Sequence, residues 1–508
     1  MDTPTTAPTS KERENTVSQS QIKLYYKNVM ADVIGPEYGI TTDQFKALAE
    51  QTAPAIEQVN QERRQGKTPF RDLPTNTQNL NQVNLVVEKL KDHCENLVVL
   101  GIGGSALGNI ALHTSLNPCF YNMDPKQRTR TENGRQRVMP RLFVFDNVDP
   151  DQFASFLNWL GEKLERTVFN IISKSGQTTE TVSQFMIIRE LLGGPKSEKY
   201  RKSVVITTEY TEKNTLLKIA REEDLQKLEL TANVGGRFSV LSAVGLFTAA
   251  LCDMDIDALL AGARDMDARV SSEDFLANPA ALNAAINYHF YNRGKKISVI
   301  MPYSYALKDW ADWYRQLWAE SLGKSKDSND KKLEVGVGPT PVKALGATDQ
   351  HSQVQLYREG PNDKLFTFLH VDNFRNDTTI GPAPQSAPQL EFLAGKSLAE
   401  LLKNEKSATE YALLHDKRPC LTVLFDQVNE YTVGQFIYLY EVTTSIAGAL
   451  FGINPYDQPA VELGKEATFA LMGKPGDYEP PDNGPSVPYA RWAEEIRAST
   501  DIDDGSLV

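Results

Sequence analysis

The sequence predicts an α/β fold built from two doubly wound, mainly parallel sheets. Its 508 residues exceed the roughly 250–300 residues at which a single hydrophobic core stops growing, which indicates more than one domain. Hydrophobic residues make up 41% of the chain and charged residues 24%, as in ordinary globular proteins. Short apolar, β-branched runs alternate with helical patterns along both halves, and this alternation is typical of α/β folds.

The predicted strands stand where these runs occur. Most runs in the first half are unbroken, which suits parallel strands that are covered on both faces. The spacing between the runs leaves room for crossover helices, and the second half repeats this pattern without a convincing sequence repeat. The predicted strands are residues 96–100, 141–145, 168–172 and 203–207 in the first half, and 296–301, 365–370 and 420–425 in the second.

Composition along the chain predicts the domain organisation. The polar stretch 265–279 separates a larger α/β domain with a helical N-terminal extension, 21–275, from a second α/β domain, 276–470. Residues 1–20 hold few apolar side chains and are expected to form a disordered tail. Residues 471–508 form a C-terminal extension, in which residues 489–496 are expected to be a short helix docked through Trp492.

Charge, cysteine and histidine usage narrow the class of protein. Lys and Arg total 54 and Asp and Glu total 66, so the net charge is −12. No basic patch is visible, and nucleic acid and anionic membranes are therefore not expected partners. The four cysteines form no CxxC pair and the six histidines show no metal-ligand spacing, so no metal site is expected.

Targeting features favour the cytoplasm. The polar N-terminus has no apolar segment of the kind that a secretory signal carries. The apolar stretch 431–452 contains Gln435, Glu441 and Thr443 among other polar residues. Because such polarity is too dense for a membrane span, we predict a buried core helix there.

Two segments directly after predicted strands indicate anion binding. Residues 101–108 read GIGGSALG, and glycines of this kind let backbone N–H groups approach an anion. The spacing differs from GxGxxG and from the P-loop, and a tight turn without a ligand explains it about as well. Residues 173–181 read SKSGQTTET, where several hydroxyl groups meet a predicted helix N-terminus. Helix capping needs one hydroxyl residue, not several, and phosphate binding is the favoured interpretation.

Two charged side chains stand where a substrate could meet them. Arg237 follows two glycines in a loop and could present its planar fork to a substrate oxygen. The helix around 310–321 buries a stripe that includes Trp313 and Leu317, with Glu320 at its edge and Gln316 one turn before. That position suits a general base. From spacing alone, an ion-paired surface Arg and a solvated Glu remain the better interpretations.

Two further residues are candidates for proton transfer. His351 stands in a polar stretch rather than on an apolar face, which favours proton transfer over a core position. Lys465 stands near a predicted helix start, where the helix dipole disfavours a cation that lacks a partner or a substrate oxygen. An ordinary surface lysine is also consistent with this pattern.

Six segments together resemble the phosphoglucose isomerase (glucose-6-phosphate isomerase) family, in its bacterial form, from about residue 96 to residue 465. They are GIGGSALG (101–108), SKSGQTTET (173–181), GGRFS (235–239), QLWAESLGK (316–324), GATDQHSQ (346–353) and DQPAVELGK (457–465), in the order that the family has them. The resemblance implies two α/β domains of the sugar-isomerase (SIS) type, in a homodimer. It also implies reversible isomerisation of glucose 6-phosphate and fructose 6-phosphate through a cis-enediol(ate), in glycolysis and gluconeogenesis. This reaction moves no hydride and needs no cofactor or metal.

The resemblance also implies residue roles. Glu320 would move a proton between C1 and C2, and Arg237 would stabilise the intermediate. His351, reaching the site from the neighbouring subunit, would assist ring opening together with Lys465. Substrate binding would fall to Gly104, Ser105, Ser173, Lys174 (through its backbone), Ser175, Thr178, Gln316 and Gln458.

Two segments depart from the longer animal-type pattern of the family. Residues 175–177 read SGQ where Thr-aromatic-Thr is more usual, and residues 459–460 read PA where Trp-Gly is common. The phosphate hydroxyls are kept, so we expect activity to survive. An isomerase that also accepts mannose 6-phosphate and a catalytically silent sugar-phosphate-binding regulator are the alternatives. The joint presence of Glu320, His351 and Lys465 counts against the regulator.

Overall fold

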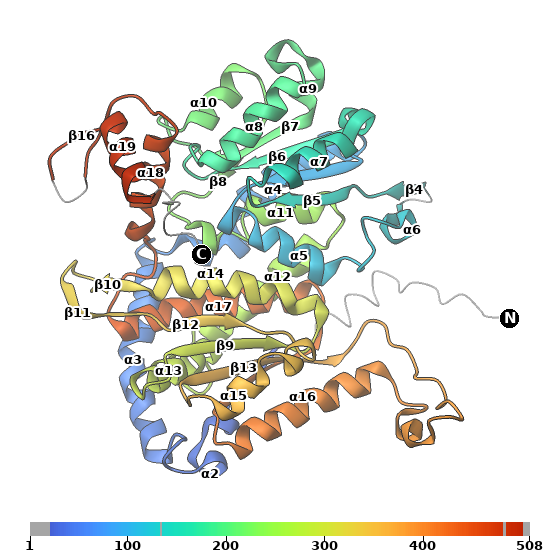
Figure 1. Ribbon diagram of the computed structural model, residues 1–508, viewed down its shortest axis with the longest axis vertical. Helices are drawn as coiled ribbons and strands as arrows, with labels where there is room; N and C mark the ends of the chain where they lie inside the picture. The colour runs from blue at the N-terminus through green and yellow to red at the C-terminus, as the bar shows by residue number, and fades with distance from the viewer. Residues whose placement is uncertain (1–20, 133–134, 481–483, 501–508) are drawn as a thin grey trace. The chain divides into compact units, whose positions relative to one another are not determined.

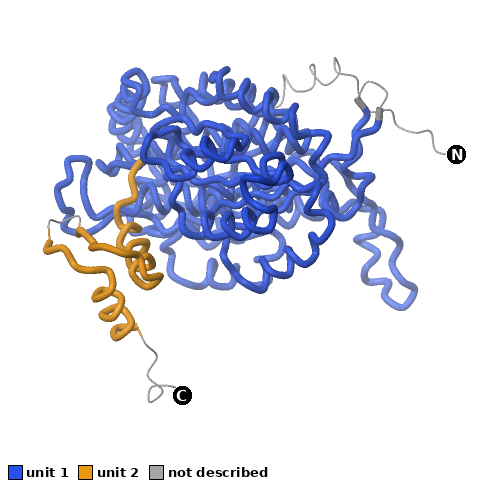
Figure 2. Tube along the Cα trace, turned by 90° about the horizontal axis from the view of Figure 1, so that it is seen from above, with its two compact units in different colours: residues 1–455 blue, residues 456–508 orange. Residues whose placement is uncertain are grey.

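The computed structural model describes residues 21–132, 135–480 and 484–500. The predicted disordered tail, 1–20, lies outside the described residues. The chain divides into two compact units, residues 1–455 and residues 456–508 (Figure 2). The division of the first unit into domains near residue 275 stays a prediction.

The first sheet is parallel throughout and has the strand order β5-β2-β6-β7-β8. All four strands predicted for this half are present. The edge strand β8 was not predicted, because its sequence QKLEL has no β-branched residue and only part of it is buried. The strands are β2 (Asn96–Leu100), β5 (Arg141–Phe145), β6 (Thr167–Ile172), β7 (Val204–Glu209) and β8 (Gln226–Leu230).

Helices cover both faces of this sheet, so its central strands are wholly buried. On one face, Val98 and Leu100 pack in a single cluster with Phe185 and Ile188 of α8 and with apolar residues of α7, α9 and α10. The helices of this region are α4 (Thr77–Leu90), α5 (Leu107–Leu116), α6 (Pro125–Arg128), α7 (Pro150–Leu160), α8 (Thr179–Leu191), α9 (Glu198–Ser203), α10 (Thr215–Glu222) and α11 (Ala243–Leu251). A small hairpin, β3 (Thr129–Glu132) with β4 (Arg135–Val138), extends from it.

The order of the strands creates a topological switch point between β2 and β6. From β2 the chain moves outward to β5, and it then crosses back to place β6 on the other side of β2. In open α/β sheets the crevice at the carboxyl ends of two such strands is the usual ligand site. The segments 101–108 and 173–181 follow these two strands.

The second sheet has the order β1-β14-β13-β9-β12 and is parallel except for its first strand. The three strands predicted in this half are β9 (Ile297–Pro302), β13 (Lys364–Asn373) and β14 (Cys420–Gln427), and the two edge strands β1 (Lys23–Tyr25) and β12 (Thr340–Lys343) were missed. The predicted α/β class with mainly parallel sheets is therefore confirmed. The helices here are α2 (Ala31–Ile34), α13 (Pro279–Asn292), α14 (Lys308–Leu322), α15 (Val354–Glu359) and α16 (Leu398–His415), beside a hairpin of β10 (Lys324–Lys326) and β11 (Lys332–Val337).

Long helices lie between the two sheets (Figure 1). The predicted core helix is α17 (Glu430–Phe451), which packs against α12 (Ile256–Val270), α13, α14 and α3 (Thr42–Arg64). Its backbone crosses α12 so closely that a Cβ on Gly434 would lie 1.9 Å from the Leu259 carbonyl oxygen. The hydroxyls of Thr443, Thr444 and Ser445 donate to carbonyls one turn earlier, as Thr443 does to Leu439, which satisfies these three groups. Among the described residues no helix meets the length and apolarity that a membrane crossing requires.

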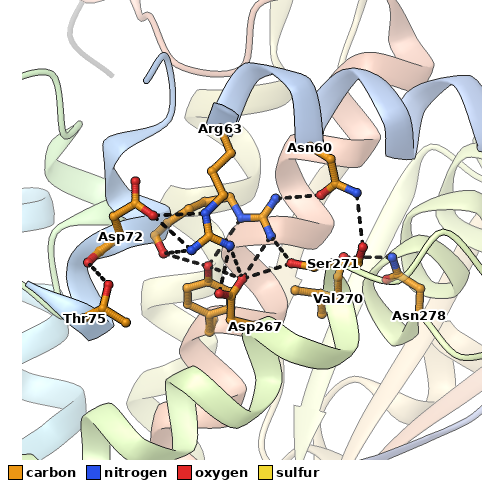
Figure 3. A network of polar contacts seen from close by, with 10 residues as sticks. Asn60, Arg63, Asp72, Thr75, Asp267, Val270, Ser271 and Asn278 are labelled. Carbon is orange, nitrogen blue, oxygen red and sulfur yellow. Dashed lines mark hydrogen bonds and ion pairs between the residues drawn. The ribbon is translucent and has the colours of Figure 1, made fainter. Parts of the chain in front are cut away.

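A polar network ties three of these elements together (Figure 3). Arg71, in the 3-10 segment Pro69–Thr75, is 1% exposed and donates to Asp267 of α12 at 3.0 Å. Arg63 of α3 binds both oxygens of the same carboxylate, at 2.7 and 2.8 Å. The Tyr438 hydroxyl of α17 donates to it at 2.7 Å. Because every member is partnered, the burial of these charges is compensated.

The second unit, residues 456–508, contains α18 (Glu462–Leu471), α19 (Tyr489–Thr500) and the short strands β15 (Asp477–Tyr478) and β16 (Val487–Pro488). Trp492 of α19 stacks on Tyr478 with ring centroids 4.3 Å apart. This confirms the predicted short helix and its docking residue.

Candidate active site

The two segments predicted to bind an anion lie at one edge of the first sheet. Leu100 of β2 pairs with Ile171 of β6, so the loops 101–105 and 173–178 leave neighbouring parallel strands at their carboxyl ends. This is the switch point described above, where a ligand would reach both loops.

The loop 173–178 is held together by its own hydroxyl groups. The Ser173 hydroxyl is buried and accepts the backbone N–H groups of Gly176 (3.1 Å) and Thr178 (3.4 Å). It also shares a hydrogen bond of 2.8 Å with the Thr178 hydroxyl. Ser175 is exposed, and its hydroxyl accepts the Gln177 N–H at 3.3 Å. The loop is therefore rigid at its base and presents Ser175 outward.

The helices that follow the two loops begin without a side-chain cap among the described residues. Thr178 is the N-cap residue of α8 but makes no capping hydrogen bond, and Ala106 opens α5 in the same way. Other helices of this region, α4, α7, α10 and α11, each begin with a side chain that accepts a first-turn N–H. Simple capping, the alternative to phosphate binding, is thus not what Thr178 does. The first turns of α5 and α8 keep N–H groups and the positive end of the helix dipole for another acceptor.

The glycine loop packs directly against the loop that carries Arg237. A Cβ on Gly104 would lie 2.1 Å from the carbonyl carbon of Gly236, so no side chain fits where these two backbones touch. Gly103 has φ +58°, and a Cβ there would lie 2.8 Å from Nε2 of Gln316. The glycines therefore let three segments, 103–105, 236–238 and the α14 residue Gln316, converge.

Arg237 is held in three directions. It is 1% exposed, and its Nε donates to the Ser321 hydroxyl at 2.7 Å. One terminal nitrogen donates to the Glu320 carboxylate at 2.6 Å and the other to the Pro455 carbonyl at 2.7 Å. The Glu320 side chain is 26% exposed. The guanidinium is thus fixed beside a carboxylate that remains accessible.

Helix α14 orients Glu320 and Gln316. The predicted stripe is buried, with Trp310, Trp313 and Leu317 each at most 1% exposed, and this packing fixes the rotation of the helix. Oε1 of Gln316 is buried without a hydrogen-bond partner among the described residues. An unpaired buried carbonyl needs a partner, and a hydroxyl of a bound sugar would supply one.

The remaining predicted residues are placed as follows. Ser105 ends the short 3-10 turn Gly103–Ser105 and is partly exposed. His351 ends another 3-10 turn, Thr348–His351, beyond β12. Its imidazole is exposed and makes no hydrogen bond or ion pair within the described part of the chain. Lys465 lies in the first turn of α18 and pairs with Glu462 at 2.7 Å, and Gln458 precedes that helix in the same unit. The structure thus brings Arg237, Glu320, Gln316 and the glycine loop together, and the loop 173–178 leaves the neighbouring strand at the same edge of the sheet. Within the described residues, no hydrogen bond or ion pair joins any of them to the His351 imidazole.

Sequence reasoning missed two groups that fix Arg237. Ser321 stands next to Glu320 in the segment 316–324, and a small hydroxyl side chain beside a carboxylate was the available indication in the sequence. The structure shows that Ser321 is buried. The Pro455 carbonyl is a backbone atom far away in the sequence, and no side-chain pattern marks it.

Comparison with known proteins identifies the family. The sequence model of phosphoglucose isomerase matches residues 84–477. Two curated relatives are named glucose-6-phosphate isomerase. The protein of Carboxydothermus hydrogenoformans is 44% identical over 456 residues, which cover 90% of this chain and 95% of that protein. The protein of Rubrobacter xylanophilus is 40% identical over 410 residues, covering 80% and 89% respectively. The chain belongs to the phosphoglucose isomerase family.

Solved structures agree with this fold. A protein of Thermus thermophilus, described as hypothetical, superposes with a TM-score of 0.75 at 31% identity and covers 89% of this chain and 100% of its own. A glucose-6-phosphate isomerase from Chlamydia trachomatis gives a TM-score of 0.73 at 21% identity, covering 91% of each chain. At that identity the second match supports the fold alone.

Proposed function

We propose that this chain is an enzyme that interconverts glucose 6-phosphate and fructose 6-phosphate. Family membership supports the reaction class. The observation that carries the proposal is the fixed pair of Arg237 and Glu320, 2.6 Å apart, at the same switch point as two anion-binding loops. An aldose–ketose isomerase needs a base and a positive donor beside a phosphate subsite, and these residues supply all three.

The phosphate monoester is bound by the loop 173–178 with help from Ser105. Ser175 and Thr178 contribute hydroxyl groups, Lys174 contributes its backbone N–H, and Ser173 holds the loop closed through its own hydroxyl. The uncapped first turn of α8 supports this assignment, because helix N–H groups and the dipole favour an anion there. Phosphate binding then orients the reacting carbons.

Glu320 removes the proton from C2 of the open-chain aldose and returns it to C1, and the reverse reaction retraces these steps. The developing charge of the cis-enediol(ate) oxygens is stabilised by Arg237, whose three fixed hydrogen bonds leave little reorganisation to be done during the reaction. Gln316 and Gln458 position the sugar. Gly104 has no side chain, so the sugar can approach the backbone of the glycine loop.

His351 and Lys465 assist ring opening by moving protons between the ring oxygen and the anomeric hydroxyl. Because the exposed imidazole of His351 has no partner within the described residues of its own chain, we assign it to the active site of the neighbouring subunit of a homodimer. A two-fold dimer would give each site one such histidine. Glycolysis and gluconeogenesis use this reaction, and a cytoplasmic location accords with that role.

The decisive experiment is a coupled assay. Purified protein receives fructose 6-phosphate with EDTA present, and glucose 6-phosphate is detected through its dehydrogenase. We expect turnover in the wild type. Replacing Glu320 by Gln removes the base and should lower kcat by about 10²–10⁴-fold, the usual contribution of a general base. Inhibition by inorganic phosphate should persist, because the phosphate loop is untouched.

A matched variant controls for changes in α14. Asp312→Asn removes a carboxylate two turns earlier, where it pairs with Arg315 and Lys343 at 2.6 and 2.7 Å, and should leave kcat near the wild-type value. Near-normal turnover in Glu320→Gln would remove Glu320 from the base role. Wild-type protein that binds phosphate without isomerising the sugar would instead be a sugar-phosphate-binding regulator.

A further inference from the structure

The loop proposed to bind phosphate is anchored from behind by two residues that the reaction itself does not use. The Ser173 carbonyl accepts a hydrogen bond of 2.6 Å from the Thr208 hydroxyl. The Lys174 carbonyl accepts one of 2.9 Å from Nδ2 of Asn214. Thr208 and Asn214 are also joined, since Nδ2 donates to the Thr208 hydroxyl at 2.7 Å. Both side chains are buried, at 0% and 2% exposure.

The same two carbonyls also accept backbone hydrogen bonds, from the Gly176 N–H to Ser173 at 3.2 Å and from the Glu209 N–H to Lys174 at 3.4 Å. Together with these bonds, the two side-chain anchors set where the loop amides point. In a trans peptide the C=O and the following N–H are antiparallel. When Thr208 and Asn214 bind the carbonyls of residues 173 and 174, the N–H groups of Lys174 and Ser175 face the opposite way. Neither N–H donates to another described residue. Successive N–H groups that point to one side form an anion-binding nest.

Asn214 has a second role besides anchoring the loop. Its Oδ1 accepts the Leu217 N–H at 3.0 Å and caps α10. The loop fits around the same oxygen, because a Cβ on Gly176 (φ +70°) would lie 2.1 Å from it. One buried amide therefore caps a helix with its oxygen and fixes the loop with its nitrogen.

We propose that Asn214, with Thr208, is a positioning residue that aims the N–H groups of Lys174 and Ser175 at the phosphate of the substrate. This inference rests on the proposed function for the identity of the ligand. It adds two residues, outside the loop and outside the six matching segments, on which phosphate affinity depends.

The test separates positioning from capping. Asn214→Ser keeps an oxygen that caps helices well but removes the Nδ2 donor. The matched control is Asn278→Ser. Asn278 caps α13 through the Ala281 N–H at 2.9 Å. Its Nδ2 donates to the carbonyl of Val270 at 2.8 Å (Figure 3) and to that of Ser272 at 2.9 Å. It is equally buried, at 0% exposure, and its carbonyl partners belong to α12 and the turn after it.

A second pair covers the case in which Asn214→Ser fails to fold. Thr208→Val removes the hydroxyl that holds the Ser173 carbonyl and keeps the shape of the side chain. Its control is Thr207→Val, which removes an equally buried hydroxyl that donates to Asn170 at 2.6 Å and touches no loop carbonyl.

Inorganic phosphate is titrated by calorimetry, and thermal midpoints report folding. Asn214→Ser and Thr208→Val should weaken phosphate binding about tenfold, as expected when well-aimed hydrogen bonds to a charged ligand are lost. The two controls should bind phosphate within about twofold of the wild type at similar thermal midpoints. KM for fructose 6-phosphate should rise in the same two variants, with a smaller change in kcat.

Two outcomes would overturn the inference. If all four variants lose stability and none loses phosphate affinity, Asn214 and Thr208 are structural only. If the controls lose affinity as strongly as the test variants, the effect is general destabilisation. Wild-type protein that binds phosphate but does not turn over sugar phosphate would refute the proposed function and leave this inference to be judged on phosphate binding alone.

Discussion

Replacing Arg237 by Lys tests whether the fixed guanidinium, and not merely its charge, drives the reaction. Lysine keeps the positive charge but has one nitrogen instead of a planar fork. It cannot reach Ser321, Glu320 and the Pro455 carbonyl at once, and these three contacts measure 2.7, 2.6 and 2.7 Å in the protein. At least one buried neutral partner is left unpaired, which costs about 1–3 kcal/mol of stability.

The catalytic loss should be larger than this cost in stability suggests. Removal of one preorganised donor to a developing oxyanion lowers kcat by about 10²–10³-fold. We therefore expect Arg237→Lys to lower kcat by that factor with a smaller change in KM. The assay is the coupled measurement with fructose 6-phosphate, accompanied by urea unfolding of each variant.

Arg71→Lys is the matched control. Arg71 is as buried as Arg237, at 1% exposure, and it also contacts several partners, among them Asn60, Asp267 and Ser271 at 3.2, 3.0 and 2.8 Å. It belongs to the network between α3, α12 and α17. The control should lose stability with kcat nearly unchanged. If both variants lose stability equally and Arg237→Lys keeps its kcat within about threefold, Arg237 is a structural anchor and the electrostatic argument fails.

Two further predictions concern the dimer and a buried acid. When Glu320→Gln and His351→Ala proteins are mixed and allowed to exchange subunits, about half of the dimers contain one subunit of each variant. If His351 acts across a two-fold interface, one of the two sites in each mixed dimer is intact, and the mixture should regain about a quarter of wild-type activity. No recovery would place His351 in the active site of its own chain. Burial raises the pKa of the Glu441 carboxyl, whose two oxygens have no hydrogen-bond partner among the described residues. Above the ordinary pKa of a Glu carboxyl, Glu441 is ionised in the unfolded state but keeps its proton in the folded state. The free energy of unfolding therefore falls as pH rises, by up to about 1.4 kcal/mol per pH unit. Glu441→Gln should remove this slope between about pH 5 and 8 in urea titrations, and an unchanged slope would contradict the assignment.

Most of the strands that could be predicted from the sequence are those that the fold buries on both faces. Strands β2, β6 and β14 are nearly continuous apolar runs because helices cover both faces of their sheets. The edge strands lack this pattern. The three residues of β1 pair with Leu424, Val423 and Thr422, nearly the whole length of the chain away, and no local pattern encodes such a partner.

The site divides in the same way. Segments 101–108 and 173–181 were recognised because each combines a strand end with small or hydroxyl residues in a few positions. The pairing of Arg237 with Glu320, by contrast, depends on α14, which follows a strand of the second sheet yet packs against the short turns of the first. Such a contact arises from the packing of elements and has no local sequence pattern.

In the loop 173–178, the number of hydroxyl residues indicates where the site is, but it does not show which hydroxyl faces the ligand and which one holds the loop together. From the sequence, Ser173, Ser175 and Thr178 are all expected to bind the phosphate. In the folded chain the Ser173 hydroxyl binds two backbone N–H groups of its own loop, whereas Ser175 is exposed. A loop must be rigid before it can aim donors at an anion, so one serine that holds the turn closed and another that faces outward are both needed. The same reasoning covers Asn214: its position before a helical pattern indicates a cap, and only the fold adds the loop carbonyl that its other end binds.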